Sequence, residues 1–360
     1  MLKNLLQNTY KIRNLEKMSK LTNYYDLYRK IHLFRNVPRA WNYLKYRSLP
    51  RKAKITISRY TPQIAGLIIT KRCNLSCDFC CIGKELNPKG WRDMEATLDK
   101  IKRIFANPLF ANCIGVDLVG GEPLIVKELD NIIFWLSKRG HYVNICTNGL
   151  YLTDNRITEL KRAGISRIRI SVYDENQKFL ENNLARINKV FPVHTSIVLE
   201  RKTVENEQEQ DKFLEKARFI HDAGSRDLLF MIYRPMGINP NPEEIISETL
   251  PAYIKFKQRI EKVLPGFCQW APANQSGKVK KRCPQVWQRI ATDMLGNMEI
   301  CCGTEMKLRG PNSNLFESEH DPEALFNHPT LVNSRKKLLD PKSEPPEMCK
   351  NCNLLGDPGW

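Results

Sequence analysis

Three cysteines close together in the first quarter of the chain are the residues best suited to chemistry. They lie in the stretch Cys73-Asn-Leu-Ser-Cys77-Asp-Phe-Cys80, directly after the apolar run Ala65-Gly-Leu-Ile-Ile-Thr70. On a loop that leaves a strand, three thiolates with CxxxCxxC spacing can each bind one iron of a [4Fe–4S] cluster. Proteins usually fill all four corners of such a cluster with cysteine. The spacing therefore predicts a cluster with one iron left open for another ligand.

A structural zinc site is the alternative interpretation of the same cysteines. Zinc usually takes paired C-x2-C half-sites or mixed Cys/His sets, and it needs four ligands. The CxxxCxxC stretch offers three cysteines and has no histidine nearby. The spacing favours iron over zinc.

A second motif follows the next apolar run of the chain. Gly120-Gly121-Glu122-Pro123 begins with two glycines, which let backbone approach a ligand closely, although alone it reads as a turn. With Phe79 before the third cysteine, the CxxxCxxC stretch resembles the signature of radical S-adenosylmethionine (SAM) enzymes. The Gly-Gly-Glu sequence resembles the motif with which this family binds the amino group of SAM. The resemblance implies that the open iron is chelated by SAM. It also implies that reductive cleavage of SAM gives a 5′-deoxyadenosyl radical, which removes hydrogen from a substrate C–H.

Three further strand-end positions match less specific features of this family. Thr147-Asn148-Gly149 resembles a turn seen in many members, Ser171 stands where the family often places a ribose-hydroxyl ligand, and Arg201 could pair with the SAM carboxylate through a bidentate fork. The alternatives are an ordinary turn at Asn148 and a solvated charge pair for Glu200 and Arg201.

A second set of cysteines lies near the carboxyl terminus. Cys283, Gly296 and Cys301 follow the pattern C-x12-G-x4-C, and Cys349 and Cys352 follow later. This resembles the SPASM/twitch extension of radical SAM enzymes and implies one auxiliary [4Fe–4S] cluster held by Cys283, Cys301, Cys349 and Cys352. The choice of Cys301 over Cys302 depends on the spacing count alone. A zinc ribbon is the alternative, because zinc also accepts four thiolates.

Six β-rich runs alternate with amphipathic stretches between Ala65 and about Pro235, which implies a parallel sheet covered by helices. In α/β folds, ligands lie at the carboxyl ends of the strands, where the motifs above fall. The family commonly has an incomplete barrel of this kind. We therefore predict an α/β fold: a partial (β/α)6 TIM-like barrel with a small C-terminal Cys-rich SPASM/twitch-like domain and a basic helical N-terminal extension. The expected strands are Leu67–Thr70, Ile114–Val119, Tyr142–Cys146, Arg167–Val172, His194–Leu199 and Leu228–Ile232, and the expected domains are 1–62 (extension), 63–235 (barrel), 236–282 (connector and helix) and 283–360 (auxiliary domain).

Composition and charge limit where the chain can work. Its 360 residues include 12 cysteines, and the sequence shows neither a secretory signal nor a run of about 20 apolar residues that would cross a bilayer. We expect a cytoplasmic protein whose cysteines bind metal.

Residues 1–60 hold 15 Lys/Arg against 2 Asp/Glu, a net charge of +13 out of +18 for the chain. This arm could contact anionic lipid, nucleic acid or an acidic peptide, or simply cap the barrel.

The fate of the substrate radical decides the reaction. If the auxiliary cluster accepts an electron, the net reaction is oxidation of a sugar, cyclitol or other biosynthetic intermediate, with a flavodoxin- or ferredoxin-type reducing partner. If a thiol returns hydrogen, the result is epimerisation, and Cys268 and Cys302 are the candidate donors. Cross-linking or epimerisation of a ribosomal peptide is a further alternative. More distant ones are a zinc-bearing nucleic-acid-binding protein and a non-catalytic iron–sulfur electron carrier.

Overall fold

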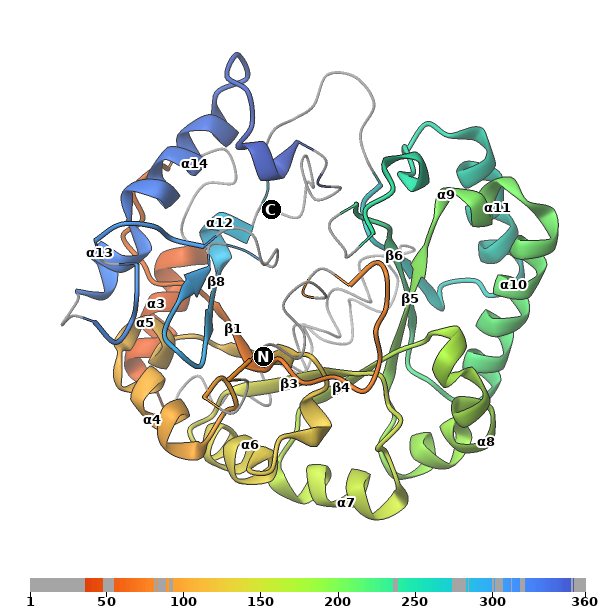
Figure 1. Cartoon of the computed structure of the whole chain (residues 1–360), viewed down its shortest axis with the longest axis horizontal. Coiled ribbons are helices and arrows are strands. Elements are labelled where there is room, and N and C mark those ends of the chain that lie inside the picture. The colour runs from red at the N-terminus through yellow and green to blue at the C-terminus, as the bar shows by residue number, and fades with distance from the viewer. Residues whose placement is uncertain are drawn as a thin grey trace, which may run out of the picture.

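The computed structural model describes residues 36–47, 55–80, 82, 89–90, 93–235, 239–273, 283, 285–299, 301, 307–311, 313–317, 321–350 and 352. Within them, one strongly curved sheet is covered on its outer side by helices (Figure 1). The strand order is β7-β6-β5-β4-β3-β2-β1-β8-β9, so the two ends of the sheet do not pair with each other. All neighbouring strands are parallel except β8 and β9. The predicted unclosed α/β barrel is confirmed, with strands β1 Ile64–Thr70, β2 Gly115–Gly120, β3 Tyr142–Thr147, β4 Arg167–Ser171, β5 His194–Leu199, β6 Leu228–Ile232, β7 Cys268–Trp270, β8 Arg289–Asp293 and β9 Met298–Glu299.

Three strands beyond the six expected ones extend the sheet at its two ends. β7 pairs in parallel with β6, and β8 pairs in parallel with β1, from Ile64 opposite Arg289 to Ile68 opposite Asp293. β9 folds back on β8 through a turn at Gly296. Residues 289–299, which the sequence assigned to a separate C-terminal domain, therefore continue the barrel sheet.

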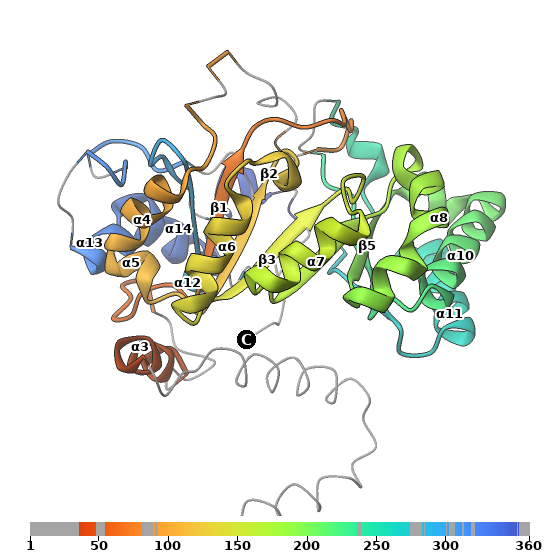
Figure 2. The ribbon, with the colours of Figure 1, turned by 90° about the horizontal axis from the view of Figure 1, so that it is seen from below.

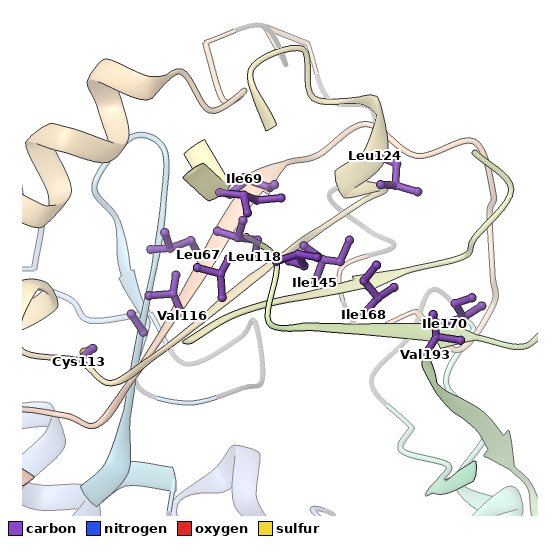
Figure 3. Packing of buried hydrophobic residues seen from close by; sticks show 14 of the residues in the cluster. Leu67, Ile69, Cys113, Val116, Leu118, Leu124, Ile145, Ile168, Ile170 and Val193 are labelled. Atoms are coloured by element: carbon purple, nitrogen blue, oxygen red, sulfur yellow. The ribbon is translucent and has the colours of Figure 1, made fainter. Parts of the chain in front are cut away.

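The strands alternate between an outer apolar face and an inner, more polar one. Figure 3 shows Leu67, Ile69, Val116, Leu118 and Ile145 in the core cluster, and all five are buried. In strands, successive side chains point to opposite faces. The residues between these positions therefore line the inside of the barrel. The helices over the outer face are α4 Leu98–Ala106, α5 Pro108–Ala111, α6 Leu129–Lys138, α7 Asp154–Ala163, α8 Asp174–Val190, α9 Arg201–Glu205, α10 Glu207–Asp222 and α11 Pro251–Val263. The later helices are α12 Gln285–Gln288, α13 Pro322–Phe326 and α14 Pro329–Leu339. Short 3-10 turns are η4 Pro123–Ile125, η5 Pro242–Glu244 and η6 Glu347–Cys349.

Local signals explain where individual helices begin and end. The Thr153 hydroxyl accepts a hydrogen bond from the Arg156 N–H (3.2 Å) and caps the start of α7. Gly164 ends the same helix in the left-handed conformation, at φ +90°. No helix within the described ranges is long and apolar enough to cross a bilayer.

Helix α3 (Val37–Arg47) lies near the amino ends of β2 and β3, and one arginine fixes it there. Arg39 is 1% exposed, and its guanidinium donates to Gly140 O (2.8 Å), Ala111 O (3.1 Å) and His141 Nε2 (3.0 Å). Because Arg39 donates to Nε2, the neutral His141 ring carries its proton on Nδ1 and donates to Cys113 O (2.9 Å). This part of the predicted basic extension is thus an integral cap, while residues 1–35 lie outside the described residues.

The buried histidine predicts a pH-dependent stability. Burial, and then the charge of Arg39, lowers the pKa of His141 to about 3. Between that pH and about 6.5, the unfolded chain binds one more proton at this position than the folded chain does. The free energy of unfolding should therefore decrease as the pH is lowered below 6.5. Between neutrality and pH 5 the decrease should be about 2 kcal/mol. Urea titrations at both pH values measure this.

Two histidine variants separate this effect from other titrating groups. His141→Asn should show a much smaller loss over this pH interval, whereas His221→Asn, at an exposed histidine of α10, should keep the wild-type loss. An equal loss in His141→Asn would contradict the assignment.

Candidate functional site

A cavity of about 490 Å³ lies inside the barrel, reaching the carboxyl ends of β1 to β6. Cys73, Cys77 and Cys80, on the loop after β1, all line it, and each is partly buried. The loop is folded locally by two hydrogen bonds, from the Cys80 N–H to Cys77 O (3.0 Å) and from the Leu75 N–H to Cys73 Sγ (3.4 Å). The structure therefore brings the three predicted thiols to one cavity wall.

The chemistry of this donor set fits an iron–sulfur cluster. Burial, followed by the nearby charges of Glu175, Cys80 and Cys73, raises the pKa of the Cys77 thiol to about 12. Thiolates crowded in this way are stabilised by a cationic metal centre, which deprotonates its cysteine ligands. A [4Fe–4S] cluster takes one thiolate at each of three irons, which suits three thiols that line one cavity.

The two glycines after β2 make room for the backbone of the cysteine loop. The Gly121 N–H donates to Thr70 O (2.8 Å), and the Glu122 N–H donates to Arg72 O (2.7 Å). A Cβ on Gly121 would lie 1.9 Å from Arg72 O, and one on Gly120 would lie 2.2 Å from Thr70 O. The sequence-based reason for these glycines, a close approach to a ligand, is therefore incomplete. Both line the cavity, but the contact that requires them is with protein backbone.

Glu122 ties the ends of two neighbouring strands together. Its side chain is 1% exposed and accepts hydrogen bonds from Thr147 Oγ1 (2.7 Å), the Asn148 N–H (2.8 Å) and the Leu124 N–H (2.9 Å). Burial raises the pKa of this carboxyl, and the three hydrogen bonds oppose that shift. Pro123 then begins the 3-10 turn η4, where its missing N–H costs nothing.

Asn148 and Ser171 also lie in the cavity wall, as predicted. Asn148 Nδ2 donates to Asn74 Oδ1 (2.8 Å), which joins the end of β3 to the cysteine loop. Asn176 Nδ2 donates both to Asn148 O (2.6 Å) and to Ser171 O (2.7 Å), which joins β3 to β4. The ends of β1, β3 and β4 thus form one hydrogen-bonded rim.

Two of the residues singled out in the sequence, Arg201 and Cys268, do not line this cavity. Arg201 is the first residue of α9, and its Nε donates to Glu205 Oε1 (2.8 Å) on the outside, with 46% of the side chain exposed. Cys268 is buried and pairs with Leu228, the first residue of β6, at the opposite end of the strands from the cysteine loop. Burial, then the charges of Glu261 and Asp227, raises its pKa to about 12. Neither residue lines the cavity. Cys302, the other candidate hydrogen donor, lies outside the described residues.

The second cysteine set is distributed over the C-terminal part of the chain. Cys301 follows β9 and lines the same cavity as the first three thiols. Cys283 is buried just before α12, and the Cys352 N–H donates to Cys349 O (3.1 Å) at the end of η6. The four-cysteine ligand set stays a prediction.

A polar network inside the barrel was missed by the sequence analysis. Arg289 on β8 crosses β1 at Gly66, where a Cβ would lie 2.8 Å from its guanidinium. It reaches Asp117 on β2 (Nη1 to Oδ2, 2.5 Å), and Asp117 Oδ1 accepts from Asn144 Nδ2 (3.0 Å). A polar residue between two apolar ones in each strand, Asp117 in β2 and Asn144 in β3, is the signal that could have revealed it.

Arg169 and Cys146 were also missed, and both line the cavity. Arg169 on β4 donates to Thr195 O (2.5 Å) and pairs with Asp227 (3.4 Å). Asp227 in turn is 2.7 Å from His194 Nδ1. Cys146 occupies an inner position of β3.

Comparison with known proteins covers both sequence and fold. The model of the Radical SAM superfamily matches residues 67–250, about half of the chain. The chain is similar to GTP 3′,8-cyclase of Aquifex aeolicus (strain VF5), with 33% identity over 193 residues, which are 49% of this chain and 58% of that protein. It is also similar to PqqA peptide cyclase of Bradyrhizobium diazoefficiens, with 32% identity over 121 residues, which are 33% of this chain and 31% of that protein. The match thus spans less than two thirds of either relative.

Solved structures show the same fold at low sequence identity. Streptococcus suis SuiB bound to S-adenosylmethionine matches with a TM-score of 0.57 and 12% identity, over 81% of this chain and 77% of that one. SuiB bound to its precursor peptide SuiA matches with a TM-score of 0.59 and 13% identity, over 82% of this chain and 70% of that one. The family match, the barrel and the three thiols at its carboxyl end agree. The chain belongs to the radical SAM superfamily, whose cofactors are a [4Fe–4S] cluster and SAM.

Proposed function

We propose that this protein reductively cleaves SAM and oxidises a substrate at a C–H bond inside the barrel, with an auxiliary [4Fe–4S] cluster taking up an electron. The observation that supports this most directly is the shared cavity. Its wall contains Cys73, Cys77 and Cys80 together with the Gly120–Glu122 segment and Ser171. In this assignment, the three thiolates hold the first cluster and leave one iron for SAM.

When bound, the cluster and SAM supply a single electron and a hydrogen-abstracting radical. The protein's own residues orient SAM and keep water away. Glu122 is buried, and a cation bound beside it would stabilise its carboxylate. The ammonium group of SAM is such a cation. Asn148 and Ser171 stand in the same wall and offer an amide and a hydroxyl for the rest of SAM.

The size of the cavity favours a small reacting group. About 490 Å³ lies within the range that holds one ligand of drug-like size, and SAM is itself such a ligand. A small reacting group therefore suits this space better than a large one. A sugar, a cyclitol or another small biosynthetic intermediate meets this condition.

A single residue of a peptide also meets it, so peptide modification is the second candidate. The similarity to PqqA peptide cyclase, at 32% identity over 121 residues, favours it. Epimerisation, with Cys302 as hydrogen donor, is the remaining alternative. Each reaction needs a reducing partner of the flavodoxin or ferredoxin type to charge the first cluster.

The test is an anaerobic reaction of the reconstituted, reduced protein with SAM, with 5′-deoxyadenosine measured alongside iron and zinc. About eight iron per chain, as two [4Fe–4S] clusters require, together with 5′-deoxyadenosine would support the proposal. Zinc in place of iron, with SAM intact, would overturn it. Candidate sugars and peptides are then ranked by how far each accelerates 5′-deoxyadenosine formation.

The auxiliary cluster can be tested on its own. Cys349→Ala should lower the iron content by about four per chain, because a cluster that loses a ligand is not retained. SAM binding should stay intact, because Cys349 does not line the cavity. Iron analysis and equilibrium dialysis with labelled SAM measure the two effects. Unchanged iron would remove Cys349 from the ligand set.

A further inference from the structure

The outer face of helix α3 is not explained by the site. Its inner face is buried through Arg39 and Asn42, but Val37 is 73%, Trp41 61% and Leu44 58% exposed. These three residues recur at intervals of four and three and therefore form one apolar stripe on the helix. Figure 2 shows α3 on the outside of the molecule, below α5 and α12.

Single exposed apolar residues are ordinary, but a cluster is not. Eight large hydrophobic residues are exposed in the described part of the chain, and four of them fall between Val37 and Ile57. The segment with Ile57 runs beside α3, because Asn42 exchanges two hydrogen bonds with the Thr61 backbone (2.9 and 3.1 Å). The exposed apolar side chains thus concentrate on the part of the molecule that carries α3.

The charged side chains in and around α3 are all basic. Residues 29–59 contain ten Lys/Arg and no Asp or Glu, and Lys45 on α3 is exposed. Trp and Leu on one helix face with cations around them are typical of helices that lie in a membrane interface. Anionic lipid attracts such basic segments. Nucleic acid would explain the cations but gives no reason for exposed Val37 and Leu44, because phosphate contacts use charged and polar groups.

We propose that α3 docks this protein on an anionic membrane surface through Val37, Trp41 and Leu44. The helix lies at the amino ends of the strands, since Arg39 donates to Ala111 O ahead of β2 and to Gly140 O ahead of β3. The cysteine loop lies at the carboxyl ends. On the membrane, the cavity therefore faces away from the lipid and stays accessible to substrate and to a reducing partner. This docking does not depend on which reaction the site performs.

The test is co-sedimentation of the full chain with vesicles of phosphatidylcholine, with and without phosphatidylserine. Wild-type protein should bind the phosphatidylserine vesicles, and added salt should weaken binding. Trp41→Ala and Leu44→Ala should each weaken it about tenfold, as expected for removing one large side chain from an apolar contact. Phe134→Ala, at a 50% exposed aromatic residue on α6, is the matched control and should bind as wild type does.

Two results would overturn the proposal. Absence of vesicle binding by the wild type, or unchanged binding in both α3 variants, would refute docking by this helix. Binding to RNA without binding to vesicles would assign the basic charge to nucleic acid instead. The rate of SAM cleavage in each variant serves as a readout of folding that is independent of lipid.

Discussion

Cys77→Ala is expected to abolish formation of 5′-deoxyadenosine, with a loss of at least about a hundredfold. Changes in the residues around metal ligands already cost about 10–100-fold, and Cys77 is assigned as a ligand itself. It stands in the cavity wall between Cys73 and Cys80, and its pKa is raised by burial and by those neighbouring thiols. Cys73→Ala and Cys80→Ala should have the same effect. The assay is SAM cleavage by purified, anaerobically reconstituted protein.

Cys268→Ala is the matched control for these variants. It removes a thiol that is also buried, but at the amino end of β6 and outside the cavity wall. SAM cleavage and the iron of the first cluster should therefore match the wild type. Cleavage that persists in Cys77→Ala would remove the CxxxCxxC loop from the cluster site.

Gly121→Ala is the second change with a large expected effect, although it removes no cysteine of the cluster loop. The added Cβ would lie 1.9 Å from Arg72 O and 3.1 Å from the Cys73 N–H nitrogen. Because the obstacle is backbone, the cysteine loop itself has to move. Overpacking of this kind costs about 1–3 kcal/mol. We expect a lower urea midpoint together with poor cluster incorporation and at least a tenfold loss of SAM cleavage.

Gly115→Ala, at the first residue of β2, the strand that Gly121 follows, is its control. A Cβ there meets only the Ile64 side chain, at 3.8 Å, which is ordinary contact. It should leave SAM cleavage unchanged and be neutral or stabilising by about 0.4–1 kcal/mol, because it restricts the unfolded chain. Equal activity in the two alanine variants would show that the close contact between Gly121 and Arg72 does not position the loop.

The six central strands could be predicted because each is a β-rich run bounded by helix or turn signals. β5 and β6 match their expected ranges. β7 and β8 could not be predicted in the same way. β7 has only three residues, and β8, Arg-Ile-Ala-Thr-Asp, carries charges at both ends. Its pairing with β1 depends on tertiary contacts that no local pattern contains.

The site was predictable where residue type and spacing are tied to one chemistry. Cys73, Cys77, Cys80, Asn148 and Ser171 reach the cavity wall as expected. Arg201 and Cys268 do not, because proximity in sequence to a strand end or to a motif does not fix where a side chain points. Arg201 begins a helix that turns its guanidinium outward to Glu205.

The pairing of β1 with β8 also affects how the chain folds during synthesis. Ile64 and Arg289 are neighbours in the sheet but 225 residues apart in sequence. At about 5–20 residues per second, a ribosome needs roughly 10–50 s to make the chain between them. During that time one side of β1 has no strand to pair with, and an open strand edge invites pairing with other chains. A nascent chain of this protein therefore passes through an aggregation-sensitive interval, which ends only when β8 has emerged.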